Sequence, residues 1–274
     1  MTEHTPAAGS VPELYVEFAR KLRPDDCVLT FNYDILLERA LEQAGVPYRL
    51  FPDRYKDVSD YGATIDDSRQ EVVVLKVHGS VDWFDRRRYE GFRRTYASQG
   101  LDPDTTPDRI FNPSHAWSLT PVVEGPRHDD DPLVSLYRIR QVEAYYWDPD
   151  WFLNTPSLIS PSTQKLVYSS YVREFWNGLG RAGWGNFRLV VIGYSLPRHD
   201  DYARQVLYSV ARNYQSENSD LATYLHIERD PIMLVDYRSS VAGLKELKQR
   251  YAFFDWSKSI LHSAGFDHSV IERL

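Results

Sequence analysis

The sequence predicts an α/β protein with a parallel sheet, helices on both faces of that sheet, and an inserted cap. Short apolar segments rich in β-branched residues alternate along the 274-residue chain with segments whose apolar residues recur at helical spacing. The strand segments are apolar at nearly every position, which is typical of strands buried on both faces. Residues 84–160 follow neither periodicity, so we expect a cap there, inserted in one domain over 11–274 that follows a disordered tail at 1–10.

The first part of the chain predicts two helices and three short strands. Apolar residues recur every three or four positions in VPELYVEFARKL, whereas CVLTF and EVVVLKV are short apolar runs with β-branched members. Gly45 ends the helical pattern of YDILLERALEQAG, because glycine readily adopts the left-handed conformation that closes a helix. The expected elements are a helix at 11–22, a strand at 27–31, a helix at 33–45, a strand at 46–51, an irregular polar stretch at 52–70 and a strand at 71–77.

Regular periodicity returns after the cap. The cap itself contains one candidate helix, DPLVSLYRIRQVEAYYW, at residues 131–147. Beyond it, helical and apolar segments alternate again, as in the first part of the chain. The expected elements are a helix at 163–183, a strand at 187–195, a helix at 199–214, a strand at 231–237, a helix at 240–251, a strand at 252–256 and a short C-terminal helix.

Composition excludes several functional classes. The net charge is −7 with a pI of about 5.6, and the only basic run is DRRRYEGFRR at residues 85–94, so nucleic-acid binding is not expected. Cys27 is the only cysteine, which excludes an intrachain disulfide and a four-cysteine zinc site, and no metal is expected. No signal peptide or membrane-spanning run is present, so we expect a cytoplasmic protein that does not bind membranes.

Polar residues follow four of the expected strands, where ligands bind in open parallel sheets. Each has a structural alternative. Asn32 and Asp34 are also suited to cap a helix, and His78 is also suited to a hydrogen-bonded position in the core. The Gly-Tyr-Ser turn can close a strand without binding phosphate, and the aspartate after the last of these strands can be a surface residue. The groups are Asn32 and Asp34, then His78, Gly79 and Ser80, then Gly193, Tyr194 and Ser195, and finally Asp236.

Four segments together resemble a known family. LTFNYDILLERAL (29–41), LKVHGSVDW (75–83), SPSTQK with the later FW, and VVIGYSLPRHDDYARQVL (190–207) are similar to the bacterial sirtuin-like proteins. These are divergent silent-information-regulator-two-like domains associated with antiphage defence. The resemblance extends over about residues 25–262, and its specificity comes from the order of the four segments.

The resemblance implies a Rossmann-like sheet that binds NAD. It implies that Asn32 positions a water or acceptor at the nicotinamide ribose and that His78 is the base, so both are expected catalytic residues. It also implies that Asp34 supports the pocket, that Gly193 and Ser195 contact the phosphate–ribose portion, and that Asp236 contacts the adenosine ribose. The remaining residues expected to contact the cofactor are Thr30, Phe31, Gly79, Ser80 and Tyr194.

Two departures from the family pattern affect the expected activity. The four-cysteine zinc module of sirtuin deacetylases is absent from this sequence, which disfavours lysine deacetylation. The family usually begins with a strand and a GAG-type turn, whereas only AAGS (7–10) and one expected helix precede the first strand here. The alternatives are a lost N-terminal unit, an incorrect gene start, or a different mode of nucleotide binding.

Three functions fit these features. The first is an NAD glycohydrolase that releases nicotinamide and depletes NAD in antiphage defence or stress. The second is a catalytically degenerate module that binds NAD, ADP-ribose or a partner protein as a sensor or scaffold. The third is ADP-ribosyl transfer to a macromolecule. In each case we expect NAD or ADP-ribose as ligand, and a homo-oligomer or a larger defence complex.

Overall fold

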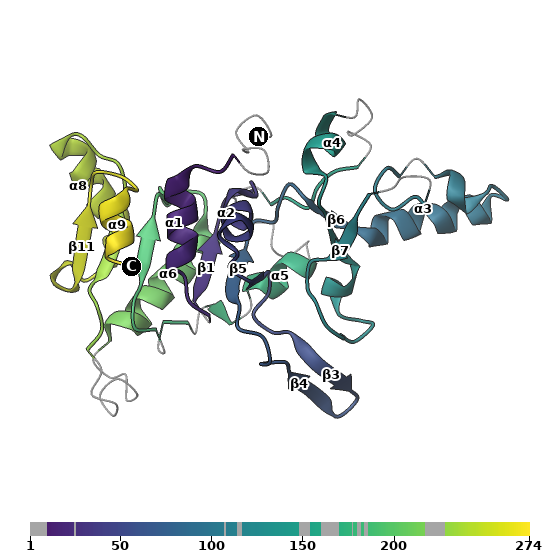
Figure 1. Ribbon diagram of the computed structural model, residues 1–274, viewed down its shortest axis with the longest axis horizontal. Helices are drawn as coiled ribbons and strands as arrows, with labels where there is room; N and C mark the ends of the chain where they lie inside the picture. Colours follow the sequence, from purple (N-terminus) through teal and green to yellow (C-terminus); the bar gives the residue numbers. More distant parts are fainter. Residues whose placement is uncertain are drawn as a thin grey trace. The chain divides into compact units, whose positions relative to one another are not determined.

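The structure is a computed structural model, and the residues that it describes form two compact units. The first contains the described residues up to 159 together with 170–175, and the second contains those from 176 to 274. Each unit has a parallel sheet of its own (Figure 1). The first part of the helix expected at 163–183, including Lys165 of the SPSTQK segment, lies outside the described residues. The described residues are 10–24, 26–106, 108–113, 117–147, 154–159, 170–176, 178–179, 182–183, 186–216 and 228–274.

The parallel sheet of the first unit is built around a fully buried central strand. The strand order is β1 (Cys27–Thr30), β5 (Val72–Lys76), β2 (Tyr48–Arg49). All five residues of β5 are buried, as its apolar sequence predicts for a strand covered on both faces. The register pairs Thr30 with Lys76, so β1 and β5 end side by side.

Two amphipathic helices pack against each other in the first unit. They are α1 (Glu13–Lys21) and α2 (Leu36–Ala44). Gly45 ends α2 in the left-handed conformation with φ 70°, which confirms the predicted stop. The helix begins at Leu36, later than predicted, because the residues after β1 form a turn before it.

Residues 52–70 are not wholly irregular, contrary to the prediction. They contain an antiparallel hairpin of β3 (Tyr55–Ser59) and β4 (Gly62–Ile65). Its side chains are largely exposed, so the sequence lacks the apolar alternation that marks a strand with one buried face. The hairpin extends away from the parallel sheet of its unit (Figure 1).

The region expected to be a cap contains a second sheet. Its antiparallel strand order is β6 (Trp83–Asp85), β8 (Leu136–Ile139), β7 (Leu119–Pro121). The predicted helix at 131–147 is therefore wrong over its first half. Residues Leu136–Ile139 form β8, which pairs with β6 on one side and β7 on the other. The other elements of this region are α3 (Arg86–Ser98), η2 (Pro103–Thr105), η3 (Pro132–Ser135) and α4 (Val142–Trp147). Helix α5 (Ser170–Trp176) follows the region and lies within the helix expected at 163–183.

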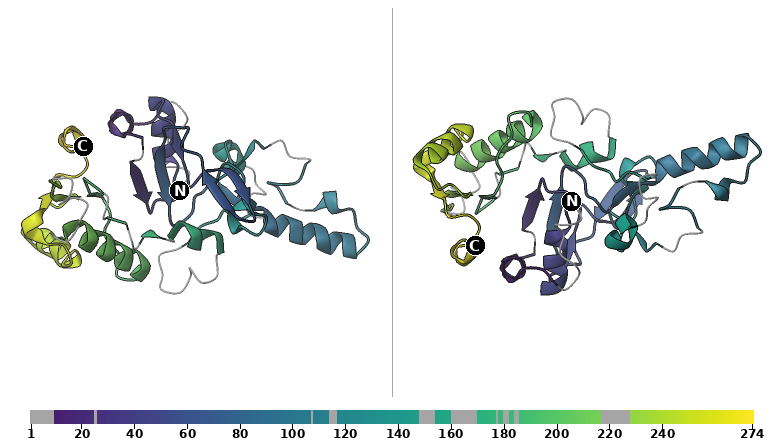
Figure 2. Two further views of the ribbon diagram at one scale, coloured as in Figure 1. Left: turned by 90° about the horizontal axis from the view of Figure 1, so that it is seen from below. Right: turned by 90° about the horizontal axis from the view of Figure 1, so that it is seen from above.

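Helix α3 contains the only basic run of the sequence. It extends outward from the antiparallel sheet in every view (Figures 1 and 2). Asp85 caps its first turn by accepting a hydrogen bond from the amide of Arg87. Apart from Tyr89, its side chains are exposed or only partly buried.

The second unit is a three-stranded parallel sheet with helices. The strand order is β11 (Ser259–His262), β10 (Ile232–Val235), β9 (Val190–Ile192), and the helices are α6 (Asp201–Gln215), α8 (Val241–Arg250) and α9 (His268–Glu272). The strand predicted at 252–256 is wrong. Phe254 is buried in a turn against Tyr251, and η6 (Trp256–Lys258) leads into the true strand, β11.

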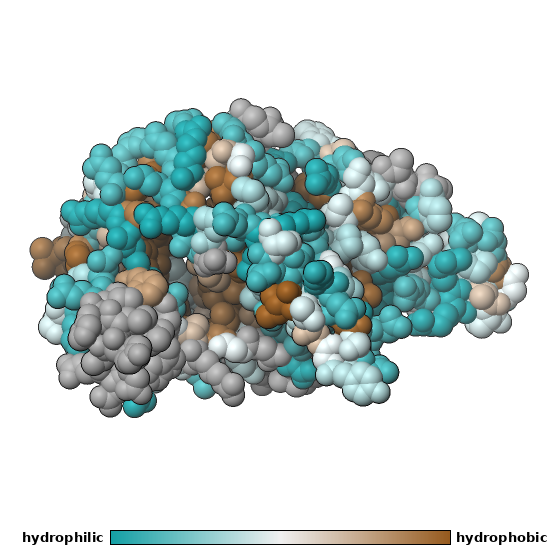
Figure 3. Space-filling model, turned by 60° about the horizontal axis from the view of Figure 1, so that its bottom comes forward, coloured by the Kyte–Doolittle hydropathy of each residue, from teal (hydrophilic) through white to brown (hydrophobic). Residues whose placement is uncertain are grey.

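These elements confirm the predicted α/β class with parallel strands and helices. Among the described residues, no helix is long and apolar enough to cross a membrane. On the face seen in Figure 3, hydrophobic residues form small groups among hydrophilic ones.

Candidate functional site

The ends of β1 and β5 bring two predicted motifs together in the first unit. The amide of Val77 donates a hydrogen bond to the carbonyl of Thr30 at 3.3 Å, one residue beyond the last pair of the ladder. Residues 31–34 and 77–80 therefore leave the sheet at the same edge. Further on, the amide of Val81 donates to the carbonyl of Tyr33 at 2.9 Å, so the two segments stay paired after the strands end.

The imidazole of His78 lies between two aromatic rings. It meets the ring of Phe31 edge-on with centroids 5.2 Å apart, and it stacks on the ring of Tyr33 at 6.1 Å. His78 is 4% exposed. Aromatic contacts of this kind favour one ring orientation by about 0.5–1.5 kcal/mol per pair. The histidine is thus held by two residues of the turn between β1 and α2.

Asn32 lies between those two aromatic residues in the chain. Its backbone amide donates to Oγ1 of Thr30 at 3.1 Å, which fixes the start of the turn. The side chain is exposed and makes no hydrogen bond within the described part of the chain. The structure therefore presents a solvent-facing amide on the segment whose neighbours hold the histidine.

Residues 157–159 cover the turn that follows β5. The carbonyl of Ser157 accepts from the amide of Ser80 at 3.2 Å, and the amide of Ile159 donates to the carbonyl of His78 at 2.8 Å. The phenol of Tyr33 donates to the carbonyl of Ile159 at 2.5 Å. The segment is thereby fastened to both motifs.

This segment explains the glycine of the His-Gly-Ser motif. Gly79 has φ 80°, and a Cβ atom there would lie 1.8 Å from the carbonyl oxygen of Ser157. The resemblance implies that Gly79 contacts the cofactor, but in the structure residue 157 occupies the side of Gly79 where a Cβ atom would lie. Ser80 is fully buried, and its hydroxyl donates to the carbonyl of Tyr33 at 3.3 Å.

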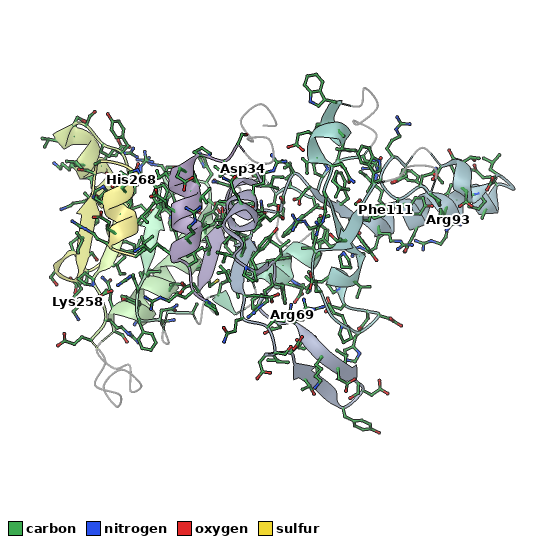
Figure 4. The ribbon with its side chains drawn as sticks, viewed as in Figure 1. Asp34, Arg69, Arg93, Phe111, Lys258 and His268 are labelled. Atoms are coloured by element: carbon green, nitrogen blue, oxygen red, sulfur yellow. The ribbon has the colours of Figure 1, made fainter. Side chains whose placement is uncertain are left out.

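Asp34 lies two residues before α2, in the turn that leads into the helix, and Ile35 is the N-cap. Oδ1 of Asp34 accepts from the amide of Leu36 at 3.0 Å, and Figure 4 labels Asp34 beside the helix. Its carbonyl accepts from the ammonium of Lys76. The side chain is therefore already engaged in local structure.

A buried ion pair lies directly behind these motifs and was missed from the sequence. Lys76 is 0% exposed and its Nζ lies 2.8 Å from Oε1 of Glu38, which is 2% exposed. Burial raises the pKa of Glu38 above its usual 4.5, and Lys76 opposes that rise. A lysine inside the otherwise apolar run EVVVLKV was the available signal, because a buried ammonium requires a partner.

The Gly-Tyr-Ser turn follows β9 in the second unit. The amide of Gly193, at φ 64°, donates to the carbonyl of Val235 at 2.8 Å. The phenol of Tyr194 donates to Asp200 Oδ2 at 2.9 Å, and burial together with that carboxylate raises the pKa of the phenol. The carbonyl of Ser195 accepts from Nη1 of Arg250 at 2.9 Å.

Asp236 follows the neighbouring strand β10, at the same edge of the second sheet as Gly193. Its Oδ1 accepts from the amide of Tyr237 at 2.7 Å, and Oδ2 lies 2.9 Å from Nη2 of Arg238. The carboxylate is therefore neutralised by a local arginine. The predicted site residues thus form two groups, one at the carboxyl edge of each unit's sheet.

Comparison with protein families bears on the first group. Residues 26–100 match the family model described as the SIR2-like domain. This segment, called the SIR2-like segment below, is similar to that family. The match confirms the resemblance to a sirtuin-like domain over these residues, and no curated protein matches the chain.

The SIR2-like segment contains the complete first group of predicted residues. It includes the turn after β1, the ion pair behind it and the His-Gly-Ser turn after β5. The residues of the second group follow it in sequence, because Gly193, Tyr194, Ser195 and Asp236 all lie beyond residue 100.

Proposed function

We propose that this protein binds NAD through its SIR2-like segment and hydrolyses the bond between nicotinamide and ribose. One observation carries the proposal: the imidazole of His78 is held between Phe31 and Tyr33, the two residues that flank the exposed Asn32 in the chain. A fixed imidazole and a polar amide are the groups that activation and positioning of a water require.

The proposed reaction balances as a hydrolysis. The bond between the ribose C1′ and the nicotinamide nitrogen breaks, and its electron pair leaves with nicotinamide, which becomes neutral. The oxygen of water forms the new bond to C1′ through an oxocarbenium-like state. Asn32 positions that water, and His78 takes the proton that the water loses, so the products are nicotinamide, ADP-ribose and a proton.

The residues of the second unit are proposed as NAD contacts on the ground of the family resemblance alone. Gly193 and Ser195 contact the phosphate–ribose portion, and Asp236 contacts the adenosine ribose. A glycine turn beside a strand end suits phosphate, and a carboxylate suits a ribose diol. We further propose a cytoplasmic role in antiphage defence or stress, within a homo-oligomer or larger complex, where depletion of NAD is the output.

Nicotinamide release tests the proposal. Purified protein is incubated with NAD, and nicotinamide and ADP-ribose are measured by chromatography. Asn32→Ala and His78→Ala are expected to lower the rate at least 100-fold with unchanged NAD binding, since general base catalysis contributes about 10²–10⁴-fold. Arg94→Ala, on the exposed face of α3, is the control and is expected to retain the rate. Equal rates in all three variants would refute the assignment.

A second candidate function is favoured by the burial of the same histidine. His78 is 4% exposed, and residues 157–159 occupy the side of Gly79 that a ligand would approach. These features suit a module that binds NAD or ADP-ribose without turnover. Calorimetry with both ligands separates the candidates: binding without nicotinamide release supports the binding module, and absence of binding rejects both.

A further inference from the structure

A cavity of about 410 Å³ lies in the first unit, at the opposite end of β5 from His78. Glu71, which immediately precedes β5, lines it, whereas His78 follows that strand. The remaining walls come from the end of α2, the edge strand β2, and strands β7 and β8. Cavities that bind small molecules have volumes of about 300–1,000 Å³. The cavity is therefore large enough for a ligand and separate from the candidate NAD site.

Two of its arginines are already neutralised and form fixed walls. Arg54, 6% exposed at its side chain, lies 2.8 Å from Glu71 through Nη2 and Oε2. Arg138 lies 3.2 Å from Asp82, which is 1% exposed. Buried pairs of this kind have little charge left to offer a ligand.

Two other arginines give the cavity a positive pole. Arg140 is exposed and makes no ion pair or hydrogen bond within the described part of the chain. Nη1 of Arg49 lies 3.8 Å from Oε2 of Glu71. The same carboxylate oxygen already pairs with Nη2 of Arg54 at 2.8 Å, so the pairing of Arg49 is the weaker of the two. Both guanidinium groups can therefore take an anionic group of a ligand, since the arginine fork matches a carboxylate.

A negative pole lies at the end of α2. Glu42 is exposed, accepts a hydrogen bond from the phenol of Tyr48 at 2.9 Å, and makes no ion pair within the described residues. The last turn of α2 has no basic residue, so the negative end of the helix dipole adds to this charge. Asp53 also lines the cavity. A cationic group of a ligand can therefore pair with Glu42 at the end of α2.

We infer that this cavity binds a small zwitterion, a free amino acid or a short peptide with free termini. Its carboxylate pairs with Arg140 and Arg49, and its ammonium pairs with Glu42 at the end of α2. A simple anion leaves the glutamate without a cation, and a simple cation leaves the arginines without an anion. A ligand that carries both charges satisfies both poles at once.

Calorimetry with a panel of free amino acids and dipeptides tests this inference. At least one member is expected to bind, and its N-acetylated form and its C-terminal amide are each expected to bind at least ten-fold more weakly. Glu42→Gln and Arg140→Gln are expected to weaken binding at least ten-fold each. Both side chains are exposed, so the variants are expected to fold, which thermal unfolding checks.

Matched controls separate this site from the rest of the molecule. Glu90→Gln and Arg94→Gln change the same residue types on α3, outside the cavity, and are expected to bind normally. His78→Ala is also expected to bind normally, since the cavity does not include it. The inference is overturned if no member binds at about 10 mM, if inorganic phosphate binds as tightly as the best member, or if the two cavity variants bind like the wild type.

Discussion

Replacing Lys76 with methionine should destabilise the first unit by leaving a carboxylate alone in the core. Methionine preserves the length and apolar stem of lysine but removes the ammonium that lies 2.8 Å from Glu38. Both partners are almost fully buried, at 0% and 2% exposure. Removing one partner of a buried pair costs about 3–5 kcal/mol, because the other charge remains desolvated without compensation. We expect a loss of that size for Lys76→Met at pH 7.

The double variant provides the decisive comparison. Lys76→Met with Glu38→Leu replaces the pair by apolar groups, a change that is often neutral or stabilising. The carbonyl of Asp34 loses its lysine donor, which costs about 1 kcal/mol. We therefore expect the double variant to lie within about 2 kcal/mol of the wild type, far from the sum of the two single changes.

The pH dependence has a defined sign. Burial raises the pKa of Glu38 above 4.5, and Lys76 opposes the rise, so the pKa of this carboxyl is higher still in Lys76→Met. Below pH 4.5 the carboxyl is protonated in both the folded and unfolded chains, and the missing ammonium costs least. As the pH rises from 4.5 through the folded-state pKa, the unfolded chain ionises first, and the deficit of the variant grows.

Urea unfolding, followed by tryptophan fluorescence, measures these effects for the wild type and the three variants between pH 4.5 and 8. A loss of less than about 1 kcal/mol for Lys76→Met at pH 7 would refute the expected role of the pair, as would single effects that add to within about 0.5 kcal/mol of the double. A deficit of Lys76→Met that grows as the pH falls would refute it as well.

Two further substitutions test the covering segment. Gly79→Ala should lower the free energy of unfolding by more than about 3 kcal/mol, because its Cβ atom would lie 1.8 Å from the carbonyl oxygen of Ser157. Gly45→Ala is the control, also at positive φ but with open space around it, and should lower that free energy by only about 1–2 kcal/mol. Equal losses of the two variants in thermal unfolding would contradict the contact at Gly79. Tyr33→Phe removes the hydrogen bond to the carbonyl of Ile159 and should cost about 1–2 kcal/mol in urea unfolding, whereas an unchanged midpoint would show that the phenol does not hold the segment.

Local sequence signals predicted the elements whose stability is decided locally. The helix stop at Gly45 and the buried strand β5 agree with the structure because left-handed closure and continuous burial leave a mark within a few residues. The hairpin of β3 and β4 left no such mark, since its side chains are mostly exposed.

Two apolar segments were assigned incorrectly because tertiary contacts decide their structure. Residues 252–256 have the aromatic content of a strand, yet Phe254 packs on Tyr251 in a turn after α8. Residues 136–139 have apolar ends that fit a helical period as well as a strand, and pairing with β6 and β7 settles the choice. In both cases a short apolar run is ambiguous without its partners.

The candidate site shows the same division between local and distant information. The strand ends identified Asn32 and His78, but the sequence could not show that Glu38 would partner Lys76 from 38 residues away. That pair joins the two motif-bearing segments, since Lys76 lies two residues before His78 and also binds the carbonyl of Asp34. Lys76 is a charged residue in an otherwise apolar strand, and its bonds to Asp34 and Glu38 fix the turn after β1 against the turn after β5. Loss of the ion pair should therefore disturb the position of His78 more than that of the β3–β4 hairpin or α3. The bonds of the pair join Lys76 to Glu38 and to the carbonyl of Asp34, and neither of them involves the hairpin or α3.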